Sequence, residues 1–202
     1  MSEEKIKLSD LKTGDLLLFE STSGFWFSNL INYFTNSVYS HAALVLQEPT
    51  YINPLLTKTY ALESGFEKFD AENNRKKDGV QIIDLAEKID SYTGHIWVRR
   101  LRHVESQDKI IESIKEMHKT FHDHHYDLNP LDPFMAAFQI KGGDDQRTNT
   151  FFCSALVCYI YCKLGLLPTE EDWDLDTPAF LAGEDVNQKF IGASLGDLIE
   201  LK

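Results

Sequence analysis

Two short uninterrupted apolar runs most constrain the fold of this chain. Residues 16–19 read Leu-Leu-Leu-Phe, directly after a Gly14-Asp15 turn, and residues 42–46 read Ala-Ala-Leu-Val-Leu. Both runs have the length of a strand, and neither shows the polar–apolar alternation of a strand with one face in water. The sequence therefore predicts two buried strands, of which the second is central in its sheet.

The remaining elements follow without strict strand–helix–strand alternation. Further strands are expected at residues 59–63, 80–84 and 95–101, and Ser64-Gly65 is expected to form a turn. Helical spacing of apolar residues predicts helices at residues 25–34 and 106–122. Residues 85–92 are expected to form one or two helical turns, and residues 151–164 are expected to form a helix closed by Gly165. This order favours an α+β fold, and the length of 202 residues fits a single domain over residues 1–202.

The net charge excludes some classes of partner. The chain has 20 Lys and Arg residues against 32 Asp and Glu residues, a formal net charge of −12. Nucleic acids and anionic lipid headgroups bind through clustered cations, so neither is an expected partner. The longest basic cluster, Arg75-Lys76-Lys77, lies in a polar, Asn-rich stretch and is expected to be an exposed loop.

The sequence shows no export signal and no membrane span. Residues 1–5 are polar and acidic, unlike the basic and then apolar start of a secretory signal. The longest apolar stretch, residues 151–167, is interrupted by Ser154, Lys163 and Gly165 and is shorter than the ~20 residues that cross a bilayer. We expect a cytoplasmic protein without a transmembrane segment.

The three cysteines, Cys153, Cys158 and Cys162, all lie in one predicted helix. An odd number in one short segment does not indicate a disulfide framework. At ~100° per residue, Cys158 and Cys162 point ~140° and ~180° away from Cys153, so the three cannot share a zinc ion. Cys158 and Cys162 are therefore predicted to be buried packing residues.

Cys153 differs from the other two because it lies in the expected first turn of its helix. Free backbone N–H groups and the helix dipole stabilise a thiolate at that position. Thiol chemistry also needs an imidazole, and a polar group that orients the imidazole. His41 and Glu63 are the candidates, because each lies on an otherwise apolar strand where a buried ionisable group needs a partner. For each residue alone, a structural role remains open.

Several segments occur in an order that resembles the circularly permuted papain-like superfamily. This group includes the YiiX/YaeF-type amidases of the NlpC-like clan and the lecithin:retinol acyltransferase-like enzymes. In ordinary NlpC-like enzymes the cysteine precedes the histidine, whereas here His41 precedes Cys153, which is the permuted order. The resemblance extends over residues 10–182. The matching segments are Gly14-Asp15, Ser40-His41-Ala42-Ala43-Leu44-Val45, Ala61-Leu62-Glu63, Asp78-Gly79-Val80-Gln81-Ile82, Val98-Arg99-Arg100-Leu101, His125-Tyr126-Asp127, Phe152-Cys153-Ser154-Ala155-Leu156-Val157, Leu164-Gly165-Leu166-Leu167 and Thr177-Pro178.

The resemblance implies a fold, a reaction and a set of roles. The fold is an antiparallel sheet packed against the helix that carries the nucleophile. Cys153 is implied as the nucleophile, His41 as the base and Glu63 as the orienting residue of a hydrolase or acyltransferase that needs neither metal nor cofactor. The substrate is a small molecule, lipid or peptide with an amide, ester or thioester carbonyl. The Cys153 backbone N–H is expected to hold the oxyanion, together with Tyr126, which matches a family tyrosine.

Two other classes of function stay open. His118, His122 and His125 follow i, i+4, i+7 spacing and can share a helical face, as the ligands of a zinc module would. Solvated histidines at a helix C-terminus also suit the helix dipole, which explains them without a metal. The second class is a non-catalytic interaction protein that keeps the fold. The apolar residues of 25–34 line either the core or an acyl groove.

Overall fold

The computed structural model describes residues 6–21, 38–122, 148–168 and 177–202. The helix expected at residues 25–34 lies outside these ranges, as do His125 and Tyr126. The described ranges include the predicted strands and the three cysteines.

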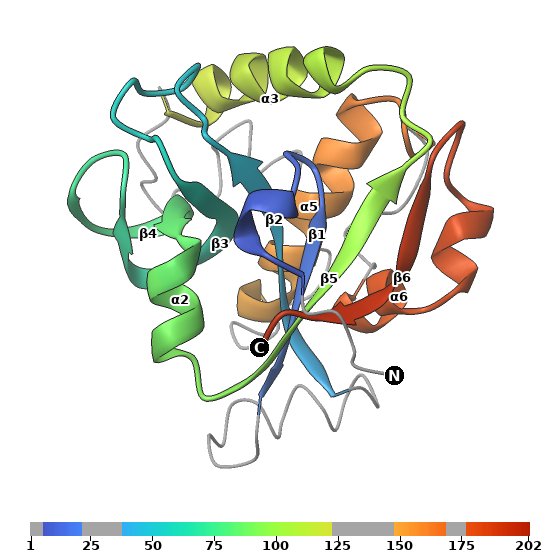
Figure 1. Ribbon diagram of the computed structural model, residues 1–202, viewed down its shortest axis with the longest axis horizontal. Coiled ribbons are helices and arrows are strands. Elements are labelled where there is room, and N and C mark those ends of the chain that lie inside the picture. The colour runs from blue at the N-terminus through green and yellow to red at the C-terminus, as the bar shows by residue number, and fades with distance from the viewer. Residues whose placement is uncertain (1–5, 22–37, 123–147, 169–176) are drawn as a thin grey trace.

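The strands form a six-stranded sheet in the order β4-β3-β2-β1-β5-β6. Every neighbouring pair is antiparallel. With the helices that pack on it, this sheet confirms the predicted α+β class (Figure 1). The strands are β1 (Leu16–Ser21), β2 (Tyr39–Gln47), β3 (Thr59–Asp70), β4 (Arg75–Asp84), β5 (Gly94–Arg102) and β6 (Ser194–Glu200).

Helices lie on both faces of the sheet and along one end of it. In Figure 1, α5 lies behind the sheet, α2 lies in front of it beside β3 and β4, and α3 runs across the top. Short 3-10 turns occur at η1 (Leu8–Asp10) and η2 (Asp185–Gln188). The helices are α2 (Leu85–Ser91), α3 (Gln107–His122), α5 (Thr148–Lys163) and α6 (Pro178–Ala182).

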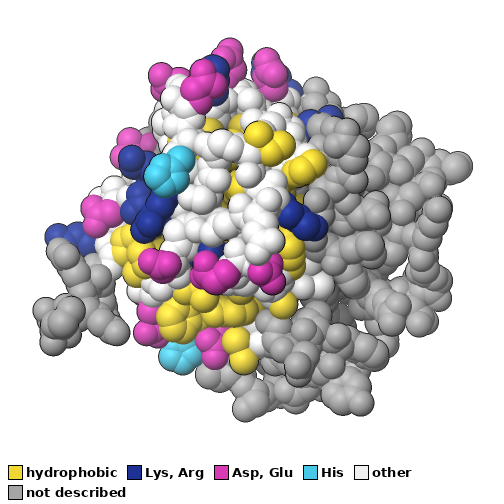
Figure 2. All heavy atoms as spheres, turned by 90° about the vertical axis from the view of Figure 1, so that its right-hand side faces the viewer, with side chains coloured by type: hydrophobic (Ala, Val, Ile, Leu, Met, Phe, Trp, Pro, Cys, Tyr) yellow, Lys and Arg dark blue, Asp and Glu magenta, His cyan; other side chains and the backbone are white. Residues whose placement is uncertain are grey.

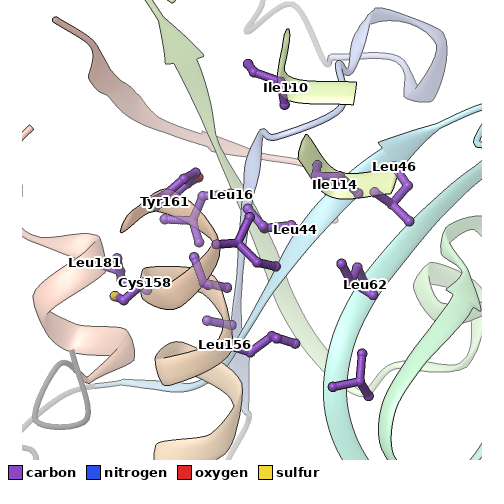
Figure 3. Close-up of a cluster of buried hydrophobic side chains, with 14 of the residues drawn as sticks. Leu16, Leu44, Leu46, Leu62, Ile110, Ile114, Leu156, Cys158, Tyr161 and Leu181 are labelled. Atoms are coloured by element: carbon purple, nitrogen blue, oxygen red, sulfur yellow. The ribbon is translucent and has the colours of Figure 1, made fainter. Parts of the chain in front are cut away.

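Two apolar clusters, one on each face, account for the uninterrupted apolar runs. Leu16 and Leu18 of β1 join the larger cluster, which contains Leu156 and Tyr161 of α5 (Figure 3). Leu17 and Phe19, which point to the opposite face, join a smaller cluster with Leu85 of α2. Successive strand residues alternate between faces, so a strand covered on both sides needs apolar residues at every position. The predicted burial of residues 16–19 and 42–46 is confirmed.

The structure corrects the predictions for the β3–β4 hairpin. Ser64-Gly65 is not a turn, because β3 continues to Asp70 after a register shift between Gly65 and Lys68. The chain turns at residues 71–74 instead, where Asn74 has a φ of 53°. The basic cluster is not a loop, because it begins β4 at Arg75, which pairs with Asp70. Cross-strand hydrogen bonds are non-local, so local polarity did not reveal this extension.

The helix that carries the cysteines begins earlier than predicted and ends as predicted. The α5 helix starts at Thr148, not at residue 151, and ends at Lys163. Gly165 follows with a φ of 71°, the left-handed conformation expected of a glycine that closes a helix. Its N–H donates to Cys162 O over 2.9 Å, and Leu166 N donates to Tyr161 O over 2.8 Å.

Among the helices in the described ranges, none combines the length and the apolar character needed to cross a lipid bilayer.

Candidate active site

His41 lies at a β-bulge near the start of β2. Phe19 of β1 pairs with His41 and Glu20 pairs with Tyr39, so Ser40 is the extra residue. A bulge changes the direction in which nearby side chains point and is frequent beside active sites. The His41 ring lies 5.2 Å from the Phe19 ring, centroid to centroid, and also contacts Cys153 of α5. The imidazole therefore lies on the same side of the sheet as Phe19, within reach of Cys153, and 23% of its side chain is exposed.

Glu63 of β3 is an ionised carboxylate inside the protein. Only 1% of its side chain is exposed, and its Oε2 lies 2.9 Å from His41 Nε2. Burial favours the neutral acid, but His41 and Lys88 outweigh burial and lower the pKa of Glu63 from 4.5 to about 2. A buried carboxylate is tolerated when paired and hydrogen-bonded, so these contacts account for its position on an apolar strand.

Cys153 completes a continuous chain of three side chains. Its thiol is hydrogen-bonded to His41. Because Glu63 engages Nε2, the imidazole nitrogen that remains for the thiol is Nδ1. Burial disfavours the charged ring, but Cys153 and the Glu63 carboxylate raise the pKa of His41 from 6.5 to about 9. The imidazole therefore keeps its proton at neutral pH. The structure brings together the three residues that the sequence singled out.

Two expectations for Cys153 are wrong. Since α5 begins at Thr148, Cys153 is its sixth residue and does not lie in the first turn. Only the first four N–H groups of a helix lack an intrahelical partner, so the Cys153 N–H is not a free oxyanion donor. Cys153 is also fully buried, with 0% exposure. His41, and not the helix dipole, is the group that can stabilise a thiolate here.

Lys88 of α2 is a member of the site that the sequence analysis missed. Its Nζ lies 3.1 Å from Glu63 Oε2 and 3.4 Å from Oε1, and 13% of its side chain is exposed. The position carries a recognisable signal. Leu85 and Ile89 form the apolar stripe of α2, and Lys88 lies on the same helical face. A lysine on the buried stripe of a short helix indicates a buried acidic partner.

Gly65 leaves room for the side chain that faces Glu63 across the β3–β4 pair. Gln81 of β4 is directly opposite Glu63 and is 1% exposed. A Cβ atom on Gly65 would lie 2.8 Å from Gln81 Nε2 and 3.5 Å from Glu63 Oε1. The sequence signal was the glycine itself, whose reason is space and not the expected turn.

We expect Gly65→Ala to destabilise the protein by ~1–3 kcal/mol, because the added methyl group forces the buried Gln81 amide to move. Urea denaturation measures this loss. Gly183→Ala is the matched control, since its nearest neighbour would be Phe180 O at 3.4 Å, an ordinary contact. Equal denaturation midpoints for the two variants would contradict the close packing around Glu63.

Of the other predicted site residues, His118 has a described side chain. His118 Nε2 is 2.8 Å from Glu72 Oε2, so this histidine has a carboxylate partner within the fold. His125 and Tyr126 are outside the described residues, and His122 has a described position in α3 only for its backbone. No group of three His, Cys, Asp or Glu side chains suited to a metal occurs in the described ranges. Cys158 and Cys162 are buried in the larger cluster, as predicted.

A surface groove of about 410 Å³ lies near the opposite end of α5. Leu164 lies eleven residues after Cys153, which corresponds to about 16 Å of helix rise. Figure 2 shows the side of the molecule that is on the right in Figure 1. Acidic side chains lie at the top of this face and hydrophobic side chains lie beneath them. None of the triad residues lines this groove. Its walls include Val104, Glu105, Ile110, Glu112, Leu164 and Ile191.

A comparison with known protein families found no match, and neither did a comparison with curated proteins.

Proposed function

We propose that this chain is a cysteine-dependent hydrolase of the permuted papain-like type, with Cys153 as nucleophile, His41 as base and Glu63 as orienting residue. One observation carries the proposal. Three residues from β2, β3 and α5 form a continuous Cys–His–Glu hydrogen-bonded chain. The fold assignment rests on the order of the matching segments and is compatible with an antiparallel sheet against the helix of the nucleophile.

The charges of the triad suit nucleophilic catalysis better than structural support. A pKa of about 9 keeps His41 protonated at neutral pH, and the imidazolium is then the counter-ion of a Cys153 thiolate. Glu63 stays ionised because its pKa is about 2, and it fixes the imidazole through Nε2. A structural scaffold needs no such ion pair, which apolar side chains of similar volume replace without loss of stability.

These positions define the order of bond changes. The Cys153 thiolate attacks the acyl carbon, so a carbon–sulfur bond forms and the carbonyl electron pair moves to oxygen. When the tetrahedral intermediate collapses, the bond to the leaving group breaks and His41 donates its proton to that group. Water then attacks the thioester while His41 takes a proton from it, which releases the acid and restores the thiolate. Tyr126 remains the proposed side-chain donor to the oxyanion.

Acyl transfer is the second candidate, favoured by the complete burial of Cys153. A thioester with 0% exposed sulfur is shielded from bulk water, which gives a bound alcohol or amine an advantage as acceptor. Product analysis distinguishes the two functions. Hydrolysis yields a free acid, whereas transfer yields a new ester or amide. The mass of an acyl group trapped on Cys153 from a cell extract identifies the substrate class.

We expect iodoacetamide at about pH 6 to alkylate Cys153 much faster than Cys158 or Cys162, because Cys153 contacts the His41 imidazolium whereas the other two pack in the larger apolar cluster. If exposure alone decided the rate of alkylation, Cys162 would react first, because it is 7% exposed whereas Cys153 and Cys158 are 0% exposed. Peptide mass spectrometry over time measures the three rates.

The control for this experiment is His41→Ala. Without the imidazolium, Cys153 is expected to react only at higher pH. Preferential labelling of Cys162, or labelling of Cys153 that does not depend on His41, contradicts the ion-pair mechanism.

A further inference from the structure

Lys88 contacts the same Glu63 carboxylate that His41 contacts, and it is held there by its own helix. Asp84 caps α2 and accepts hydrogen bonds from Ala86 N and Glu87 N, which fixes the first turn. The Lys88 ammonium then reaches both oxygens of Glu63 and lies 5.0 Å from the centroid of the Phe19 ring. Its side chain is 13% exposed, so water does not screen this contact as it does at the surface.

Glu63 needs a counter-ion that does not change during turnover. His41 is positively charged only until it donates its proton to the leaving group. From that step until the proton returns, an imidazole without charge faces a carboxylate that is 1% exposed. An unpaired buried carboxylate is costly, so Glu63 alone would hold the proton on His41. Lys88 takes no part in this proton transfer, and its ammonium contacts both oxygens of Glu63, so it is placed to neutralise Glu63 in both states.

We propose that Lys88 is a positioning residue of this site, the permanent countercharge of Glu63 that allows His41 to release its proton. This inference rests on the proposed function. Lys88 acts through Glu63 and has no assigned contact with a substrate. Its role differs from that of Glu63, which orients the imidazole and favours its charged form.

Charged and titratable groups reach Glu63 from several elements. His41 comes from β2 and Lys88 from α2. Tyr92 follows α2. Burial raises the pKa of Tyr92, and the nearby Glu63 carboxylate raises it further. The neighbour from β4 is the neutral amide of Gln81. Cys153 lies on the other side of His41. Lys88 is thus the one permanent cation among these groups, and its removal leaves His41 as the remaining positive partner.

We test this inference by titrating the His41 ring by NMR, with the signal assigned by its loss in His41→Ala. Lys88→Met is expected to move the titration midpoint to higher pH by roughly half a pH unit or more, because Glu63 then depends on the imidazolium alone. Lys88→Gln is the second neutral variant, since its amide still donates to the carboxylate. Circular dichroism melting shows which variants are folded.

Two controls separate this effect from a general change in charge. Lys88→Arg retains the cation and is expected to keep the wild-type midpoint. Lys58→Met also removes one lysine, but Lys58 pairs with Asp84, is 63% exposed and is not expected to change the titration. If both neutral variants of Lys88 keep the wild-type midpoint, the inference is overturned.

A Glu63→Gln background tests whether Lys88 acts through the carboxylate. There, Lys88→Met is expected to shift His41 by less than half of its effect in the wild-type background. Equal shifts in both backgrounds mean that Lys88 repels the imidazolium directly, which overturns the positioning role. A different result would show that the proposed function is wrong. In that case Cys153→Ala would leave the titration midpoint of the His41 ring unchanged, independently of the result for the Lys88 variants.

Discussion

Cys153→Ala and His41→Ala are each expected to lower turnover by a factor of about 10⁴ or more in a protein that remains folded. The first variant lacks the atom that forms the acyl-enzyme, and the second lacks the group that moves the proton. Glu63→Gln is expected to be milder, because an amide keeps one hydrogen bond to the imidazole but loses the charge that stabilises its protonated form. The measurement is hydrolysis of p-nitrophenyl esters with short and long acyl chains.

Cys158→Ala is the matched control for this prediction. Cys158 lies on the same helix as Cys153, is equally buried and packs in the larger apolar cluster. Both cysteine variants lose one buried sulfur and are expected to lose a similar ~1 kcal/mol of stability. Only Cys153→Ala is expected to lose activity. Equal activity of the two variants, in any assay that the wild type supports, would contradict the triad.

The second large effect concerns Arg99, which holds β5 to the segment around α6 and β6. Arg99 is 1% exposed, and the carboxylate of Glu184 lies 3.9 Å from its Nη2 but is 82% exposed. Its guanidinium donates instead to backbone carbonyls. The acceptors are Gly196 O at 2.7 Å, Leu181 O and Gly183 O at 2.8 Å each, and Leu195 O at 3.3 Å.

Arg99→Met is therefore expected to destabilise the protein by about 3–5 kcal/mol, since it removes the guanidinium donor from four backbone carbonyls, of which Leu195 O keeps a hydrogen bond from Asn187 Nδ2. Arg99→Lys is expected to lose nearly as much, because an ammonium does not reproduce the planar fork of donors. Urea denaturation followed by circular dichroism measures the loss. Arg102→Met, at an exposed position on the same strand, is the matched control. Similar midpoints for Arg99→Met and Arg102→Met would contradict this role.

Local patterns predicted the central part of the fold. Residues 16–19 and 42–46 were identified as buried strands because a strand covered on both faces carries apolar residues at every position. The end of α5 was predicted by Gly165, since a left-handed residue after a helix favours glycine. The β6 strand was missed because Ser194–Glu200 mixes glycine and acidic residues and gains its strand conformation by pairing with β5.

Local patterns in the sequence pointed to the candidate residues: a cysteine expected in the first turn of a helix, and a histidine and a glutamate on apolar strands where each needs a partner. Only the tertiary structure decided that these three meet, that Cys153 lies in the second turn of α5 and is fully buried, and that Lys88 completes the charge balance of Glu63. The physical reason is the range of the interactions. Hydrophobic periodicity and helix ends depend on residues a few positions apart. The partner of a buried charge instead depends on contacts between elements distant in the sequence, which exist only once the chain has folded.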